Sequence, residues 1–178
     1  FFDAGSGLIQ AGKELIPEIL EHKKKSSDPF QITIIFTHTH IDHLLGLNFF
    51  IPIYMPGVHM NFIGPATLGV DLEDILRKTC EPQFHPVSMD EFRCTKYFEN
   101  VNENMVVYFL KNDPNPYIDE TGAPAPKNAE ITIKNMKYYF HPKDGCYIYR
   151  IEYNDNKLVF ATDVEEYVGG DQRLISFS

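Results

Sequence analysis

The chain has 178 residues, with 16 Lys and Arg against 25 Asp and Glu, and a formal net charge of −9. This length and a hydrophobic fraction of 43% predict one globular domain with a sizeable core. The acidic balance disfavours binding to long nucleic acids, which depends on clustered Lys and Arg. No apolar run reaches the ~18 residues of a membrane span. Three scattered cysteines without a CxxC pair indicate a reducing, cytoplasmic location rather than a disulfide framework or a thiolate zinc site.

The first half of the chain predicts helices alternating with strands. A short apolar run over residues 1–7 precedes an amphipathic helix over about residues 9–24. Residues 31–36 are nearly continuous β-branched and apolar sequence, which is typical of a strand buried on both faces. Because this strand follows a helix, the α/β class is expected. The later expected elements are a short helix or turn over 44–50, a strand over 59–63 and a helix over 70–79.

The second half predicts mainly strands. Residues 111–130 contain four prolines and many polar residues, so we expect a long exposed loop there. Asn154, Asp155 and Asn156 predict a hairpin turn between two strands. The expected strands cover residues 105–110, 131–141, 146–153 and 157–162.

A cluster of metal-competent side chains follows the strand over residues 31–36. The sequence there reads Thr37-His38-Thr39-His40-Ile41-Asp42-His43, and loops at the carboxyl ends of strands are where α/β sheets place their sites. In an extended loop His38 and His40 point the same way and can hold one ion, while Asp42 and His43 reach a neighbouring position. Imidazole and carboxylate ligands without thiolate suit zinc, iron or manganese. The alternative is a polar, His-rich surface loop, and the spacing favours the metal site.

The motif His-x-His-x-Asp-His after an apolar strand resembles the signature of the metallo-β-lactamase superfamily. Residues 2–7, Phe-Asp-Ala-Gly-Ser-Gly, resemble the strand and glycine turn that precede this motif in the family. His141 ahead of the strand over 146–152 is similar to the segment that supplies the family's next ligand. Residues 159–163, Val-Phe-Ala-Thr-Asp, resemble the strand whose final aspartate bridges two metals.

Two further likenesses narrow the resemblance. The separation of His141 and Asp163 by one hairpin is similar to the ribonuclease Z and phosphodiesterase branch of the superfamily. Residues 49–57 and the pair Gly64-Pro65 resemble an uncharacterised bacterial subgroup of hydrolases on that branch. The resemblance covers nearly the whole chain.

The resemblance implies a fold and a set of metal ligands. The fold is the αβ/βα sandwich, and residues 1–178 would form a single domain of this type. The family has one further histidine well past the bridging aspartate, and the chain has none there. The abrupt ends and this difference lead us to expect a partial domain, truncated at both ends. The implied ligands of two divalent ions, zinc first with manganese or iron as alternatives, are His38, His40 and His141 for one, Asp42 and His43 for the other, and Asp163 between them.

The implied activity is hydrolysis by a metal-bound hydroxide, with Asp42 as the catalytic residue that orients or deprotonates the water. We expect a phosphodiesterase that acts on a small or cyclic phosphodiester, and therefore a small anionic substrate. Between His141 and Asp163 there is no inserted arm of the kind with which ribonuclease Z enzymes grip tRNA. The alternatives are a carbon-ester hydrolase, such as a lactonase or thioesterase, and a non-catalytic metal-binding domain. No membrane partner is expected, and a homodimer is one alternative for the oligomeric state.

Other residues near these motifs have weaker interpretations. Asp3 is expected to support the site or its turn rather than to bind metal. His85 is expected to be an ordinary loop histidine. Phe49, Phe50 and Tyr54 either line a cleft above the metals or pack in the core, and the sequence does not choose between these alternatives.

Overall fold

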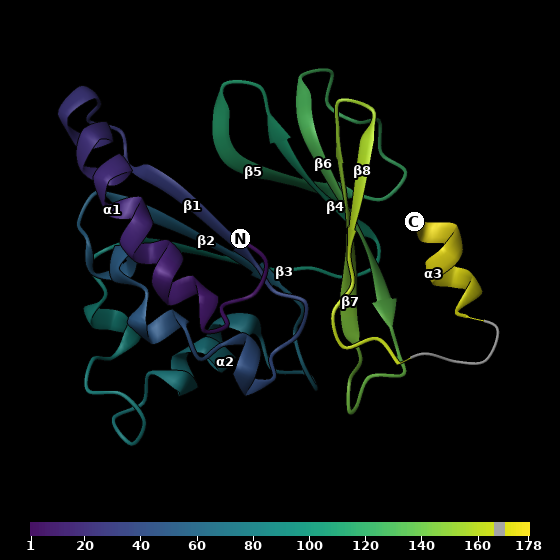
Figure 1. Cartoon of the computed structure of the whole chain (residues 1–178), viewed down its shortest axis with the longest axis horizontal. Coiled ribbons are helices and arrows are strands. Elements are labelled where there is room, and N and C mark those ends of the chain that lie inside the picture. Colours follow the sequence, from purple (N-terminus) through teal and green to yellow (C-terminus); the bar gives the residue numbers. More distant parts are fainter. Residues whose placement is uncertain (166–169) are drawn as a thin grey trace. The chain divides into compact units, whose positions relative to one another are not determined.

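The computed structural model describes residues 1–165 and 170–178, and the chain forms two compact units. We refer to Phe1–Asn100 as the N-terminal unit and to Val101–Ser178 as the C-terminal unit, and describe each by itself. The first contains a parallel sheet with helices, and the second an antiparallel sheet with one short helix (Figure 1). The predicted α/β class is thus confirmed.

The sheet of the N-terminal unit has three parallel strands in the order β1-β2-β3. These strands are β1 (Phe30–Ile35), β2 (Val58–Gly64) and β3 (Thr95–Asn100). The helices are α1 (Gly7–Lys25) and α2 (Leu72–Thr79), with 3-10 turns η1 (Ile41–His43), η2 (Leu47–Phe49), η3 (Ile51–Tyr54) and η4 (Met89–Glu91). The helices expected over 9–24 and 70–79 and the strand expected over 59–63 are confirmed.

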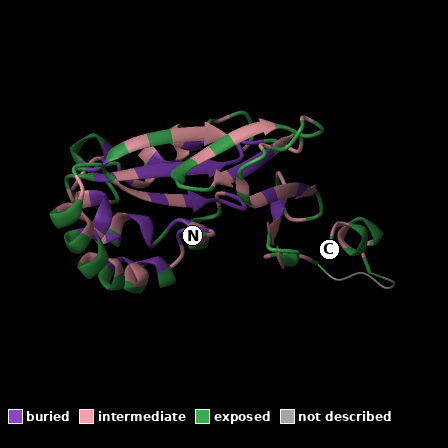
Figure 2. Ribbon diagram, turned by 90° about the horizontal axis from the view of Figure 1, so that it is seen from above, coloured by how far each residue is buried: buried purple, intermediate pink, exposed green. Residues whose placement is uncertain are grey.

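The two faces of this sheet differ in polarity, because the strand register aligns apolar residues on one face and more polar residues on the other. Ile34, Phe62 and Phe98 are paired across the strands and belong to the apolar core, which α1 covers through Ile19. Thr33, Asn61 and Tyr97 are paired on the alternate, polar positions. Figure 2 shows the buried positions gathered in the strands, while the outer side of α1 is exposed. Burial on both faces of β1, expected along its whole length, occurs only at its carboxyl end.

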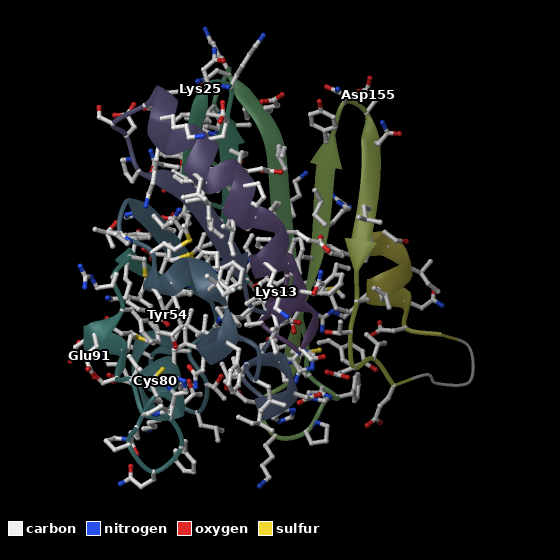
Figure 3. All side chains as sticks on the ribbon, turned by 60° about the vertical axis from the view of Figure 1, so that its left-hand side comes forward. Lys13, Lys25, Tyr54, Cys80, Glu91 and Asp155 are labelled. Carbon is white, nitrogen blue, oxygen red and sulfur yellow. The ribbon has the colours of Figure 1, made fainter. Side chains whose placement is uncertain are left out.

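The C-terminal unit is an antiparallel sheet with the strand order β5-β4-β6-β7-β8. Asn154 and Asp155 adopt positive φ angles of 45° and 62°, and they form the predicted hairpin turn, with Asp155 at its tip (Figure 3). Leu174 and Phe177 pack against a buried cluster of the sheet that includes Met136 and Ile148. The elements are β4 (Met105–Leu110), β5 (Asp113–Glu120), β6 (Ala129–Tyr138), β7 (Cys146–Tyr153), β8 (Asn156–Phe160) and α3 (Gln172–Phe177).

The prediction of a long loop over residues 111–130 is wrong in its first half. Residues Asp113–Glu120 form β5, which pairs with β4 on one side and lies at the edge of the sheet. Proline cannot donate to a ladder, but an edge strand has one side that needs no partner, so Pro114 and Pro116 are accommodated. No strand was predicted for residues 95–100, which form β3.

None of the helices in the described part of the chain is both long and apolar enough to cross a membrane. Cys80, Cys94 and Cys146 are buried, and no disulfide joins them. They contribute to the two cores as small apolar side chains.

Candidate metal centre

The histidine motif leaves the carboxyl end of β1 and is held there by the first residues of the chain. Phe1 to Asp3 lie beside β1, where the amide of Asp3 donates to the carbonyl of Ile35 at 2.9 Å. The amide of Ala4 then donates to the carbonyl of His43 at 2.7 Å. Thr37 and His38 are buried, whereas His40 is exposed and extended. The loop therefore has a fixed backbone on both sides of its ligands.

Gly46 allows the loop to approach the N-terminal segment closely. Its amide donates to the carbonyl oxygen of Ala4 at 2.7 Å. A Cβ atom at Gly46 would lie 2.1 Å from the carbonyl oxygen of Gly5, which is backbone and cannot move aside alone. The φ angle is −77°, a value open to any residue, so the requirement for glycine is steric.

We expect Gly46→Ala to destabilise the chain by about 1–3 kcal/mol or more, because the added methyl group overpacks a backbone contact. The matched control is Gly7→Ala, where the added Cβ would have no atom within 4 Å. Free energies of unfolding from urea titrations measure both effects. Equal stabilities of the two variants would contradict the steric role of Gly46.

Asp3 joins the first residues of the chain to the motif through its carboxylate. Oδ1 accepts from the amide of Thr37 at 2.7 Å, and Oδ2 accepts from the Thr37 hydroxyl and from Nδ1 of His43, each at 2.8 Å. The residue is 8% exposed and has a left-handed φ of 57°. Burial raises the pKa of the Asp3 carboxyl, and the bonds from Thr37 and His43 act in the opposite direction.

These hydrogen bonds determine which nitrogen of each histidine carries a proton. A carboxylate only accepts, so Nδ1 of His43 is the donor to Asp3. The single hydroxyl proton of Thr37 goes to Asp3, so Nδ1 of His38, 3.0 Å from the Thr37 oxygen, is the donor there. In the neutral imidazoles Nε2 then carries the lone pair. Both rings are oriented as they would be in a metal site that binds through Nε2.

The ligand atoms of the histidines converge within the N-terminal unit. Nε2 of His38 lies 3.0 Å from Nδ1 of His40. Two nitrogens bound to one tetrahedral zinc at 2.0–2.1 Å are ~3.3 Å apart, so this pair fits one ion. Ligand atoms of His38 and His43 lie within 4.8 Å of one another, and their ring centroids are 4.1 Å apart. The structure thus contains histidine side chains close enough to bind a metal ion, and their chemistry suits zinc, manganese or iron.

Asp42 is the exposed member of the motif. Its side chain is 72% exposed, and Oδ2 lies 3.4 Å from Nε2 of His43. The motif therefore places one carboxylate beside the largely buried imidazole of His43, where it can bind a metal ion or water.

His141 and Asp163 belong to the C-terminal unit, at one end of its sheet. β7 is antiparallel to both β6 and β8, so the carboxyl ends of β6 and β8 lie at the same end, beside Cys146. His141 follows β6 and Asp163 follows β8, and the Cys146 thiol donates to the carbonyl of Thr162 at 3.5 Å. Their role as ligands together with the histidine motif stays a prediction.

Thr37 is the residue of the site to which the sequence assigned no role. Its hydroxyl and amide link Asp3 to His38, a function that requires residues 34 positions apart to meet. A signal was present in the polar threonine directly after a buried strand, but threonine is too common to be specific. Asp3 supports the ligands, as predicted.

The aromatic residues left open by the sequence fall into different environments. Phe50 is fully buried in the core of the N-terminal unit. Tyr54 packs against the ring of Phe92 and donates to the carbonyl of Asn48 at 2.6 Å. Phe49 is 58% exposed. Its ring makes an edge contact with His85.

No protein-family model matches the chain, and no curated protein matches its sequence.

Proposed function

We propose that this chain is a metal-dependent hydrolase, a phosphodiesterase that acts on a small or cyclic phosphodiester. The observation that carries the proposal is the convergence of His38, His40 and His43, with the tautomers of His38 and His43 set by Asp3 and Thr37. A polar surface loop has no need for this buried support, whereas metal-binding histidines usually have it. The likeness of the motif to the metallo-β-lactamase superfamily supports the same activity.

The proposal includes the finer fold and the ligand assignment. The two units would together form one domain with the αβ/βα sandwich of that superfamily. His38, His40 and His141 would hold one divalent ion, Asp42 and His43 the second, and Asp163 both. Zinc is the first choice, with manganese and iron as alternatives, because imidazole and carboxylate donors suit all three.

The side chains of the N-terminal unit define the chemistry that the site can perform. A divalent ion, when bound, lowers the pKa of water towards ~7 and stabilises negative charge on a phosphoryl oxygen. Asp42 is exposed beside His43, so its carboxylate can orient a water molecule and accept its proton. Asp3 and Thr37 hold the imidazoles in place, which keeps the ligand atoms converged without reorganisation.

The expected substrate is small and anionic. Long nucleic acids are not expected, because the net charge of −9 repels a polyanion. A reducing, cytoplasmic location belongs to the same proposal and is supported by three cysteines without a disulfide.

Hydrolysis of bis(p-nitrophenyl) phosphate by the whole chain tests the proposal. We expect release of p-nitrophenol after loading with Zn²⁺ or Mn²⁺, loss of this activity with a chelator, and recovery on adding the metal back. Bound metal per chain is measured in parallel. Cleavage of a lactone or thioester without cleavage of the phosphodiester would replace the proposal by a carbon-ester hydrolase. Bound metal without any turnover would indicate a non-catalytic metal-binding domain.

A further inference from the structure

The turns that follow the histidine motif have a buried side and an outer side. Leu44 and Leu47 are buried in the core of the N-terminal unit. Ile41, Leu45 and Phe49 are instead 61%, 52% and 58% exposed. The amide of Leu45 donates to the carbonyl of Ile41 at 2.9 Å, so these two residues are neighbours on one helical turn. Large apolar side chains thus lie in solvent directly after the metal-binding motif.

The exposed carboxylate of Asp42 belongs to the same outer side. Asp42 lies three residues before Leu45, a spacing that makes two side chains neighbours on a helical turn. Its Oδ2 lies 3.4 Å from Nε2 of His43, which is one of the converging histidines. The exposed apolar side chains therefore border the candidate metal centre at the carboxylate that can take up the proton of water.

The segment that contains this surface has almost no charged side chains. Residues 29–70 include no Lys or Arg, and Asp42 is their only Asp or Glu. A substrate group with a further negative charge, such as a second phosphate, would find no Lys or Arg in this segment to pair with. The composition therefore suits an uncharged, apolar group.

The exposed apolar area is too small for a stable protein partner. Large side chains bury roughly 150–250 Å² each, so three that are little more than half exposed offer about 300–400 Å². Phe84, which precedes His85 and is 76% exposed, adds no more than about 200 Å². A stable protein interface buries about 800 Å² on each partner. The area matches a small apolar group, such as one aromatic ring.

We propose that Ile41, Leu45 and Phe49 bind an aromatic ester group of the phosphodiester, and that this group stays on the phosphorus after hydrolysis. The inference rests on the proposed hydrolase function. An aromatic ring can pack against Phe49, whose ring already makes an edge contact with His85. In phosphoryl transfer the attacking and leaving oxygens are roughly in line, so the leaving group departs away from the attacking water. The ester group beside Asp42 is therefore the retained one.

The bonds made and broken in this step are those of a simple hydrolysis. The water oxygen forms the new bond to phosphorus, and the proton of the water passes to the Asp42 carboxylate. The leaving alkoxide or phenolate departs with the electron pair of the bond that breaks. The second product is a phosphomonoester that carries the aromatic group.

Two substrates with the same leaving group test which group is retained on the surface. Bis(p-nitrophenyl) phosphate retains an aromatic ester and methyl p-nitrophenyl phosphate retains a methyl ester. Leu45→Gln keeps the size and helix propensity of leucine and removes its apolar character. We expect the ratio of kcat/KM for the two substrates to shift away from the aromatic ester by at least about fivefold in this variant. The control is Leu20→Gln, an exposed position on α1 roughly 20 Å along the helix from Gly7, and it should keep the ratio of the unmodified chain. An unchanged ratio in Leu45→Gln, or equal shifts in both variants, would overturn the inference.

Calorimetric titration with diphenyl phosphate and dimethyl phosphate separates this inference from the hydrolase proposal, because binding needs no turnover. In the presence of Zn²⁺ we expect the whole chain to bind diphenyl phosphate at least about tenfold more tightly, and Leu45→Gln to lose most of this preference. Bound metal per chain should be the same in both, and loss of metal from Leu45→Gln would make the role of Leu45 structural and overturn the inference. The expected preference without turnover of any phosphodiester would reject the hydrolase and support the apolar surface. Equal affinities for the two diesters, or no detectable binding of diphenyl phosphate at ~10 mM, would overturn the surface even if phosphodiesters are hydrolysed.

Discussion

Replacing His40 by alanine is expected to remove one metal ion from each chain and to lower phosphodiester hydrolysis by at least ~10²-fold, as the loss of an essential catalytic group does. Nδ1 of His40 lies 3.0 Å from Nε2 of His38, and alanine offers no donor atom in its place. The side chain is exposed, so the free energy of unfolding should change by less than about 0.5 kcal/mol. Metal content by mass spectrometry and initial hydrolysis rates measure the effect.

The control for this variant is His59→Ala. His59 lies on β2, with Nδ1 2.7 Å from the hydroxyl of Thr95, and belongs to no group of metal-competent side chains in the described residues. This variant should retain full metal content and activity. If His40→Ala also retains both, His40 is not a ligand and the assignment of the motif fails.

Asp3→Asn is expected to weaken metal binding by roughly 10- to 100-fold, although Asp3 need not touch the ion. An amide has one acceptor oxygen, whereas the carboxylate accepts with both, from the Thr37 amide, the Thr37 hydroxyl and Nδ1 of His43. At least one of these donors would face an NH₂ group, and where that group replaces Oδ2 the hydrogen bonds that set the imidazole tautomers are lost. Competition with a chromophoric chelator measures the affinity, and nitrogen chemical shifts report the tautomer of His43.

Asp28→Asn is the matched control, since Asp28 is an exposed turn residue bonded to Ser26. It should leave both the metal affinity and the histidine shifts unchanged. A purely structural role of Asp3 would lower the unfolding temperature but leave the histidine tautomers and the affinity of the folded fraction as they are. That result would reject its positioning role.

Local sequence patterns predicted much of the fold, whereas the remaining strands depend on pairing with segments that are distant in the sequence. The spacing of apolar residues within each segment was enough to predict the helix α1 and the strand β2. Strand β5 could not be predicted, because Pro114 and Pro116 argue against a strand unless its place at the sheet edge is known. Strand β3, with Lys96 and Tyr97 in its middle, shows only a weak alternation of exposed and less exposed side chains. This pattern identifies a strand only when its pairing with β2 is known.

The candidate site shows the same division. His38, His40, Asp42 and His43 were predicted from residue type and spacing along one loop, and the histidines do converge. The connection from Asp3 through Thr37 to His38 could not be predicted, because it depends on the N-terminal segment lying beside β1. That His141 and Asp163 join the same site stays a prediction, and the measurement of bound metal per chain tests it.

The carboxylate of Asp3 also couples ion binding to folding. Its bonds to Thr37 and His43 close loops of 34 and 40 residues, so the ligand geometry exists only when the first strand and the N-terminal segment have docked. An ion that binds this geometry and not the unfolded chain raises the free energy of unfolding by RT ln(1 + [ion]/Kd). Metal supply would then set the fraction of chains in which the first residues are docked, and the docked residues in turn set the affinity for the metal.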